Sequence, residues 1–282
     1  MRFATFALLL SALLFAFSAP AFANEILYSV SPQDDLLRTV DPADASTGGS
    51  VSITLGGNPI AGAHGLATHP LTNQLWALVR TGSQLDPRLL VTVDRITGVA
   101  ILVGNTGDLF VALAFDASGT LYGMTGDGAS QPNALATLST LDATPTFVLT
   151  PANGFGGHAL AYHDLDGMLY HVADIDIFKL FEKISIGAYT STPIPLSGTG
   201  FTHARALTYE GAGDFLLAMR AVGGPTKPGS GAGAEEFLTR LTDGGAVSLI
   251  GALDHVTRGL AFVTLPVPVE ETSWGRIKSR GR

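Results

Sequence analysis

Short apolar runs alternate with polar turn residues along most of the chain. The runs at 89–94, 99–104, 111–115 and 120–125 are rich in Val, Leu, Ile, Thr and Tyr, and Gly, Asp and Asn stand between such runs. This composition is typical of β-strands joined by tight turns. No stretch after the first 23 residues sustains a helical period with capping residues at its ends. The pattern therefore predicts an all-β protein.

One apolar phrase recurs five times at nearly constant spacing. It consists of a small residue, a leucine and then Ala or Thr. The central leucines are Leu66, Leu113, Leu160, Leu207 and Leu260. The first three intervals are each 47 residues long, and the last, of 53 residues, contains a Gly- and Pro-rich insertion at 223–236. A fixed period in this range is typical of β-propellers, in which each repeat supplies one four-stranded blade.

The phrase also has a packing pattern, because alternate residues of a strand face opposite sides. In the segment 112–115, one side carries two alanines and the other carries Leu113 and Phe115. Propeller blades pack face to face, so a bulky side that meets a small side fills the gap without overpacking. Since blades crowd together near the axis, we expect the phrase to form the innermost strand of each blade.

The chain begins and ends in the middle of a repeat. The segment 26–30 matches the second strand of the repeat, whereas 259–263 is a first strand with no second strand after it. Pairing these two segments closes a fifth blade and removes an exposed sheet edge. The sequence therefore predicts a five-bladed β-propeller of four-stranded antiparallel blades over residues 24–265, closed by its N- and C-terminal strands.

The first 23 residues have the features of a secretory signal peptide. Arg2 precedes an apolar stretch at 3–17, and Ala21 and Ala23 form an A-x-A cleavage signal. We expect a protein that is secreted, periplasmic or held at the cell surface, and a retained N-terminal anchor is the alternative. The basic tail at 266–282 is interpreted either as a sorting segment or as a flexible end.

The composition excludes several classes of function. The chain has a net charge of −8, which becomes −9 once the leader and its single arginine are removed. This acidic balance argues against nucleic-acid binding, which needs a basic surface. The sequence has no cysteine, so it has neither disulfides nor thiolate chemistry. No run of 18 apolar residues follows the leader, and we expect no transmembrane segment after cleavage.

The stretch 93–124 resembles the repeats of secreted bacterial propellers that are grouped loosely with the YVTN and NHL repeats. The resemblance extends over nearly the whole chain after the leader. It implies the propeller architecture but not one function. Such families include binding scaffolds, hydrolases, lactonases and members without a known activity, and one fold commonly carries many functions.

Candidate functional residues gather on one predicted face. The loops that precede each first strand and follow each second strand share a face, and they are longer than the turns on the other face. Four repeats carry His or Arg directly before the small residue of the phrase, and two further histidines lie nearby. The six candidates for a ligand site at the channel mouth are His64, His158, His203, Arg205, His255 and Arg258.

These residue types support three interpretations. They can hydrogen-bond loop backbone around the axis, form a pocket for an anion, or perform acid–base catalysis. No H-x-H or H-E-x-x-H spacing occurs, so we expect no metal site and no cofactor. If the residues form an anion pocket, protonation of the histidines should strengthen binding as the pH falls through about 6.5.

The sequence thus favours a secreted, monomeric binding or interaction module. Its expected partner is a small anionic ligand or an extracellular protein. The alternative is a hydrolase or lactonase that uses the same mouth, and a convergent acid–base or metal constellation would distinguish it.

Overall fold

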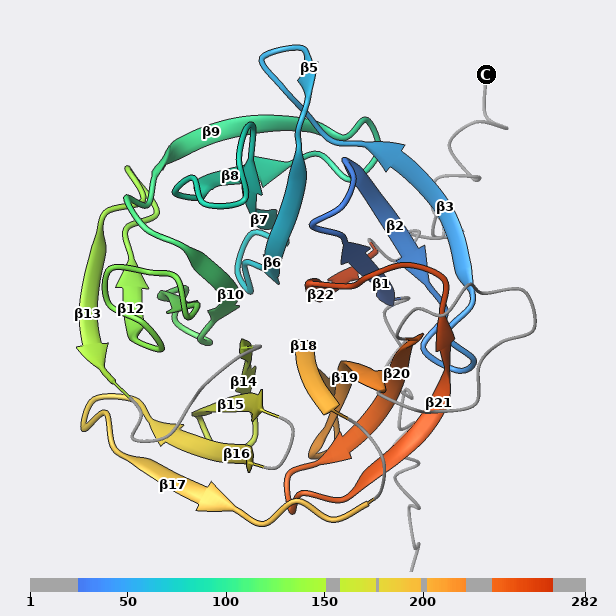
Figure 1. The fold of residues 1–282 in the computed structure, drawn as a ribbon, viewed down its shortest axis with the longest axis vertical. Coiled ribbons are helices and arrows are strands. Elements are labelled where there is room, and N and C mark those ends of the chain that lie inside the picture. Colours follow the sequence, from blue (N-terminus) through green and yellow to red (C-terminus); the bar gives the residue numbers. More distant parts are fainter. Residues whose placement is uncertain (1–24, 151–157, 176–177, 199–201, 222–234, 266–282) are drawn as a thin grey trace, which may run out of the picture. The chain divides into compact units, whose positions relative to one another are not determined.

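The computed structural model describes residues 25–150, 158–175, 178–198, 202–221 and 235–265. Within these ranges every regular element is a β-strand, and the strands form five sheets around a central axis (Figure 1). The predicted all-β, five-bladed β-propeller is therefore confirmed. The predicted signal peptide at 1–23 and the tail at 266–282 lie outside the described residues. In the part of the chain that is described, no helix has the length and apolarity needed to cross a membrane.

Each blade is an antiparallel meander whose strands follow one another from the axis outward. Blade 1 comprises β22 (Gly259–Thr264), β1 (Glu25–Val30), β2 (Leu36–Val40) and β3 (Thr47–Ser52). Blade 2 comprises β6 (Gly62–Thr68), β7 (Leu75–Arg80), β8 (Leu89–Val93) and β9 (Val99–Asn105). Blade 3 comprises β10 (Phe110–Phe115), β11 (Leu121–Thr125), β12 (Leu135–Leu138) and β13 (Pro145–Leu149).

The last two blades follow the same order. Blade 4 comprises β14 (His158–His163), β15 (Met168–Ile175), β16 (Phe178–Ser185) and β17 (Ser191–Ile194). Blade 5 comprises β18 (Thr202–Gly211), β19 (Asp214–Ala221), β20 (Glu235–Thr242) and β21 (Val247–Leu253). A short hairpin of β4 (Thr54–Leu55) and β5 (Asn58–Pro59) extends blade 2, because β4 pairs in parallel with β9. The sequence pattern did not predict this hairpin.

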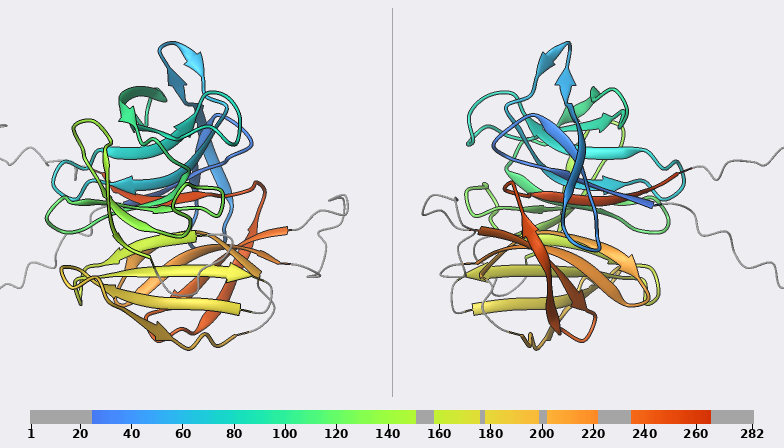
Figure 2. Two further views of the ribbon diagram at one scale, coloured as in Figure 1. Left: turned by 60° about the vertical axis from the view of Figure 1, so that its left-hand side comes forward. Right: turned by 90° about the vertical axis from the view of Figure 1, so that its right-hand side faces the viewer.

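The two ends of the described chain close blade 1. Strands β1 and β22 pair antiparallel over six residues, with Ile26 opposite Val263 and Val30 opposite Gly259. Figure 2 shows β22, in red, beside β1, in blue. The predicted closure of a fifth blade by the terminal strands is confirmed, and it leaves β22 as an inner strand with a partner.

The predicted grouping of strands needs one correction. The order of the runs in the sequence predicts that 89–94 and 99–104 form one four-strand unit with 111–115 and 120–125. In the structure these two runs are β8 and β9 of blade 2. β8 pairs with β7, and β9 pairs with β8 on the side away from the axis. The reason is that consecutive strands form hairpins. The chain therefore completes one blade from its inner strand outward before it crosses to the inner strand of the next blade.

Packing between blades follows the predicted bulky-on-small pattern. Each of the five hydrophobic clusters contains residues of two neighbouring blades. Ala112 and Ala114 of blade 3 pack in one cluster with Leu160 of blade 4. Leu113, from the opposite side of the same strand, packs in another cluster with Trp76 of blade 2. The core is therefore a ring of interfaces, and each blade contributes a small side and a bulky side.

Crowding at the axis explains why a small residue precedes each central leucine. A Cβ atom built on Gly65 would lie 3.2 Å from the Cα of Ala112 in the next blade. A Cβ atom built on Gly259 would lie 2.8 Å from the backbone nitrogen of Leu66. Inner strands of neighbouring blades thus approach so closely that only glycine or alanine fits at this position.

We expect Ala159→Leu to lower the free energy of unfolding by about 1–3 kcal/mol through overpacking. Ala159 is fully buried, at 0% exposure, in the cluster between blades 4 and 5. The matched control is Ala117→Leu, because Ala117 is exposed in a turn. Urea denaturation of both variants measures the difference. Equal destabilisation of the two variants would show that the face of β14 is assigned incorrectly.

Candidate functional site

Five leucines close the centre of the propeller. Each is at most 4% exposed, and the free space beside them is about 10 Å³. This leucine ring consists of Leu66, Leu113, Leu160, Leu207 and Leu260. It separates two cavities at opposite ends of the inner strands. One of about 460 Å³ lies where the inner strands begin, and one of about 320 Å³ lies where they end.

The larger cavity, which we call the arginine mouth, is built by blades 1, 2 and 5. Its lining residues are Pro32, Gln33, His64, Gln84, Arg88, Arg205, Arg220, Glu236, Val256 and Arg258. Three of the six predicted residues, His64, Arg205 and Arg258, are therefore brought together. Each lies at the start of an inner strand, which is the position that the repeat assigned to them.

The other three candidates do not belong to the described lining. The side chain of His158 lies outside the described residues. His203 has a positive φ of 64° and is half-buried. His255 is held by hydrogen bonds to Ser29 at 2.9 Å, to Asp254 at 2.7 Å and to Thr257 at 3.1 Å. His255 thus has a structural role beside the closing strands, where burial lowers its pKa.

Five polar residues of the arginine mouth were not among the sequence candidates, namely Gln33, Gln84, Arg88, Arg220 and Glu236. Gln84 and Arg88 come from the long loop between β7 and β8, on the face that was predicted to carry function. Arg220 and Glu236 lie opposite each other on β19 and β20. The repeated phrase marks only first strands, so it gave no signal for residues at the ends of second and third strands.

Positive charge exceeds negative charge in the arginine mouth. Four arginines line it, and Glu236 is the one carboxylate among the described lining residues. Its Oε1 lies 3.7 Å from Nε of Arg205. Burial raises the pKa of Glu236, although Arg205, Arg258 and Arg220 each oppose this effect. The glutamate therefore compensates only part of the arginine charge, and less of it as the pH falls.

Two of the arginines, Arg88 and Arg258, form no salt bridge with the described residues, although Asp86 and Glu236 lie near enough to affect their charges. The guanidinium of Arg88 is 4% exposed and donates hydrogen bonds to the backbone carbonyls of Gln84 and Asp86, which carry no net charge. Nε of Arg258 is buried without a hydrogen-bond partner among the described residues. Burial and neighbouring Arg205 lower the pKa of Arg258 to about 10, so it remains protonated near neutral pH.

His64 does not act as the predicted pH-dependent cation. Burial, followed by the charges of Arg88 and Arg258, lowers its pKa to about 3. It is therefore neutral through the whole range in which a histidine ordinarily titrates. The expectation that its protonation strengthens anion binding below pH 6.5 is wrong for this residue, because a second positive charge cannot form beside buried arginines at that pH.

The geometry of the arginine mouth suits binding of an anion. Guanidinium groups present planar pairs of donors that match carboxylate or phosphate oxygens. A neutral histidine and glutamine side chains supply further hydrogen-bonding groups without adding charge. Over the described ranges, no group of three or more His, Asp or Glu side chains is placed to hold a metal ion.

Comparisons with known proteins show the fold. No family model and no curated protein matches the sequence. A chain from the crystal structure of a nidogen/laminin complex has a TM-score of 0.55 at 9% identity, covering 85% of this chain and 98% of that chain. A protein assigned as TolB from Agrobacterium tumefaciens has a TM-score of 0.50 at 12% identity, covering 87% and 91%. These likenesses support the β-propeller part of the predicted resemblance, while secretion and a bacterial source stay predictions.

Proposed function

We propose that this protein is an exported binding module that captures a small anion, a carboxylate or phosphate compound, in the arginine mouth. The observation that supports the proposal is the excess of four arginines over one carboxylate in a single cavity. The export part rests on the sequence features of residues 1–23. A cavity of about 460 Å³ is within the ordinary size of small-molecule sites.

Burial strengthens the attraction between the arginines and a bound anion. Arg205 and Arg88 are 9% and 4% exposed, so water screens them less than it screens surface charges. Arg258 lines the cavity and forms no salt bridge with the described residues, so an anion that enters can pair with its guanidinium group. The hydrolase or lactonase alternative has no comparable support, since a histidine with a pKa of about 3 is a poor general base near neutral pH.

We expect Arg258→Gln to weaken binding of inorganic phosphate or citrate by about tenfold or more, because a charge-assisted hydrogen bond is lost. Isothermal titration calorimetry at low ionic strength measures the affinity. Arg95→Gln is the control, because Arg95 lies in the turn between β8 and β9, at the other end of the strands. Equal affinity in the wild type and both variants, with all three folded, would contradict an anion site in this cavity.

We also expect anion binding to strengthen as the pH falls, with Glu236 as the titrating group. Its pKa is raised by burial, so its negative charge is lost at a higher pH than for an ordinary glutamate. Glu236→Gln should therefore bind more tightly than the wild type at pH 8 and should show a flatter pH profile. Titrations from pH 8 to pH 5 test this expectation. A pH profile unchanged by Glu236→Gln would contradict the assignment.

A further inference from the structure

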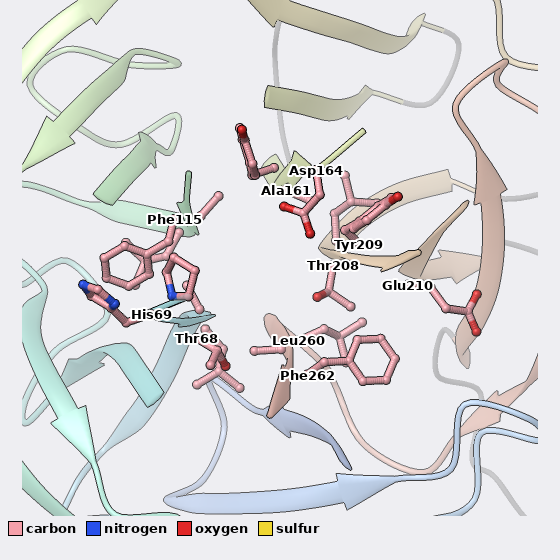
Figure 3. Close-up of a pocket in the computed structure, with 18 of the residues that line it drawn as sticks. Thr68, His69, Phe115, Ala161, Asp164, Thr208, Tyr209, Glu210, Leu260 and Phe262 are labelled. Carbon is pink, nitrogen blue, oxygen red and sulfur yellow. The ribbon is translucent and has the colours of Figure 1, made fainter. Parts of the chain in front are cut away.

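The cavity at the other end of the leucine ring differs from the arginine mouth in charge and in its content of Phe and Tyr. We call it the aromatic mouth, and Figure 3 shows it in close-up, with parts of the chain in front cut away. It has a volume of about 320 Å³, and the five leucines form its floor. No lysine or arginine belongs to its described lining. The two ends of the axis therefore present opposite chemistry.

Aromatic side chains surround this cavity because of the strand repeat. The residue two positions after each ring leucine lies on the same side of the strand as that leucine. In four blades this residue is aromatic, and in blade 2 it is Thr68. The four aromatic residues are Phe115, Tyr162, Tyr209 and Phe262. Equivalent positions around one axis thus place these four residues in the lining of one opening, and the ring of Phe115 also packs against His69 and Trp76 (Figure 3).

One carboxylate in this lining has no partner among the described residues. Asp164 is in the turn after β14, and in Figure 3 its carboxylate is directed toward the cavity. It forms no hydrogen bond or salt bridge with the described residues, and burial raises its pKa. Glu210 differs, because Arg240 donates two hydrogen bonds of 2.8 Å to it. No salt bridge with a described residue therefore competes with a cationic ligand for Asp164, and a bound cation would favour its charged form against the effect of burial.

The lining also contains one buried hydroxyl group. Oγ1 of Thr68 is buried and has no hydrogen-bond partner among the described residues. Thr68 lies in the lining across the opening from Asp164 (Figure 3). Because Oγ1 of Thr68 is not accessible from the cavity, the group that selects a ligand is Asp164, which favours a positive charge. The rest of such a ligand contacts leucine and aromatic carbon atoms.

We propose that the aromatic mouth binds a small organic ammonium ion, with its cationic head between Asp164 and the aromatic rings. Aromatic faces attract alkylammonium groups through their electron-rich surfaces, and a nearby carboxylate adds a direct charge interaction. An apolar floor suits the alkyl groups of such an ion, which an inorganic cation lacks. This site is independent of the anion site, from which the leucine ring separates it.

The decisive experiment compares choline with its neutral carbon isostere, 3,3-dimethylbutan-1-ol. The two compounds have the same shape, so the difference in affinity reports on the positive charge. We expect choline to bind about tenfold more tightly, measured by calorimetry or by ligand-observed NMR. Asp164→Asn should remove most of this difference. Equal affinity for the two compounds, or no binding of either, would overturn the proposal.

Matched variants separate the site from the fold and from the anion site. Asp142→Asn is the carboxylate control, because Asp142 is exposed in the turn between β12 and β13. Phe262→Leu keeps an apolar side chain but removes a ring, and should weaken choline binding by about threefold to tenfold. Arg258→Gln should leave choline binding unchanged. If Asp164→Asn retains the full preference for choline, the carboxylate has no role in binding and the proposal is wrong.

A further arm identifies the source of the ammonium group. The same chemistry occurs in a free quaternary ammonium compound and in an exposed lysine side chain of a protein. Titration with N-acetyl-lysinamide tests the second source. Tighter binding of choline than of N-acetyl-lysinamide supports the proposed free organic ammonium ligand. Tighter binding of N-acetyl-lysinamide would overturn that assignment of the ligand.

Discussion

Deletion of residues 25–31 is expected to abolish cooperative folding of the propeller. The deletion removes β1, which pairs with β22 on one side and β2 on the other. It also removes Leu27 and Val30, which are 1% and 0% exposed. The burial of each such side chain contributes about 1.5–3 kcal/mol to the free energy of unfolding. These losses are large relative to a domain stability of about 5–15 kcal/mol. Thermal denaturation followed by circular dichroism measures the effect.

Two further chains show whether closure itself is responsible. Deletion of residues 268–282 shortens the protein by more residues but leaves all strand pairs of blade 1 intact, so its melting temperature should stay near that of the full-length protein. A permuted chain that joins residue 264 to residue 25 by a short linker and starts before β2 should also fold, because it keeps both strand pairs. A cooperative transition at the original temperature after deletion of 25–31 would contradict closure by β1.

The propeller was predictable because its information is repeated. Five copies of one phrase define the inner strands. The sequence starts at a second strand of the repeat and ends at a first strand, which shows that these two strands together complete one blade. Among the described residues the hairpin of β4 and β5 occurs in one blade only, and each of its strands has two residues. A feature so short and so local leaves no period in the sequence, so a search for patterns cannot detect it.

The candidate site was predictable in part, for the same physical reason. His64, Arg205 and Arg258 lie at or just before the beginning of equivalent inner strands, and equivalent strands place them at one end of the axis. Arg88 and Glu236 reach the same cavity from a loop and from a third strand, where loop lengths differ between blades. Their convergence depends on three-dimensional geometry. The low pKa of His64 likewise arises from burial beside arginines, and neither burial nor that proximity is visible in the spacing of residues.

A buried pair of charged or polar side chains lies within blade 4. His171 on β15 and Glu182 on β16 are directly opposite each other and are 0% and 2% exposed. Nδ1 of His171 lies 2.8 Å from Oε1 of Glu182. Single and double substitutions of this pair should differ in their cost to the free energy of unfolding. Removing one partner leaves the other buried without this hydrogen bond, whereas removing both leaves no buried polar group that has lost its partner.

We therefore expect His171→Leu to lower the free energy of unfolding by about 3–5 kcal/mol, since the carboxylate of Glu182 then remains buried without its histidine. The double variant His171→Leu/Glu182→Leu should be less destabilised than the sum of the two single variants. Urea denaturation of the four proteins gives the coupling energy. The less buried pair of Arg240 and Glu210, whose side chains are 41% and 22% exposed, is the control, and Arg240→Gln should cost about 1 kcal/mol or less. Additive effects at His171 and Glu182 would show that the two side chains do not compensate one another in the core, even though they lie in direct contact.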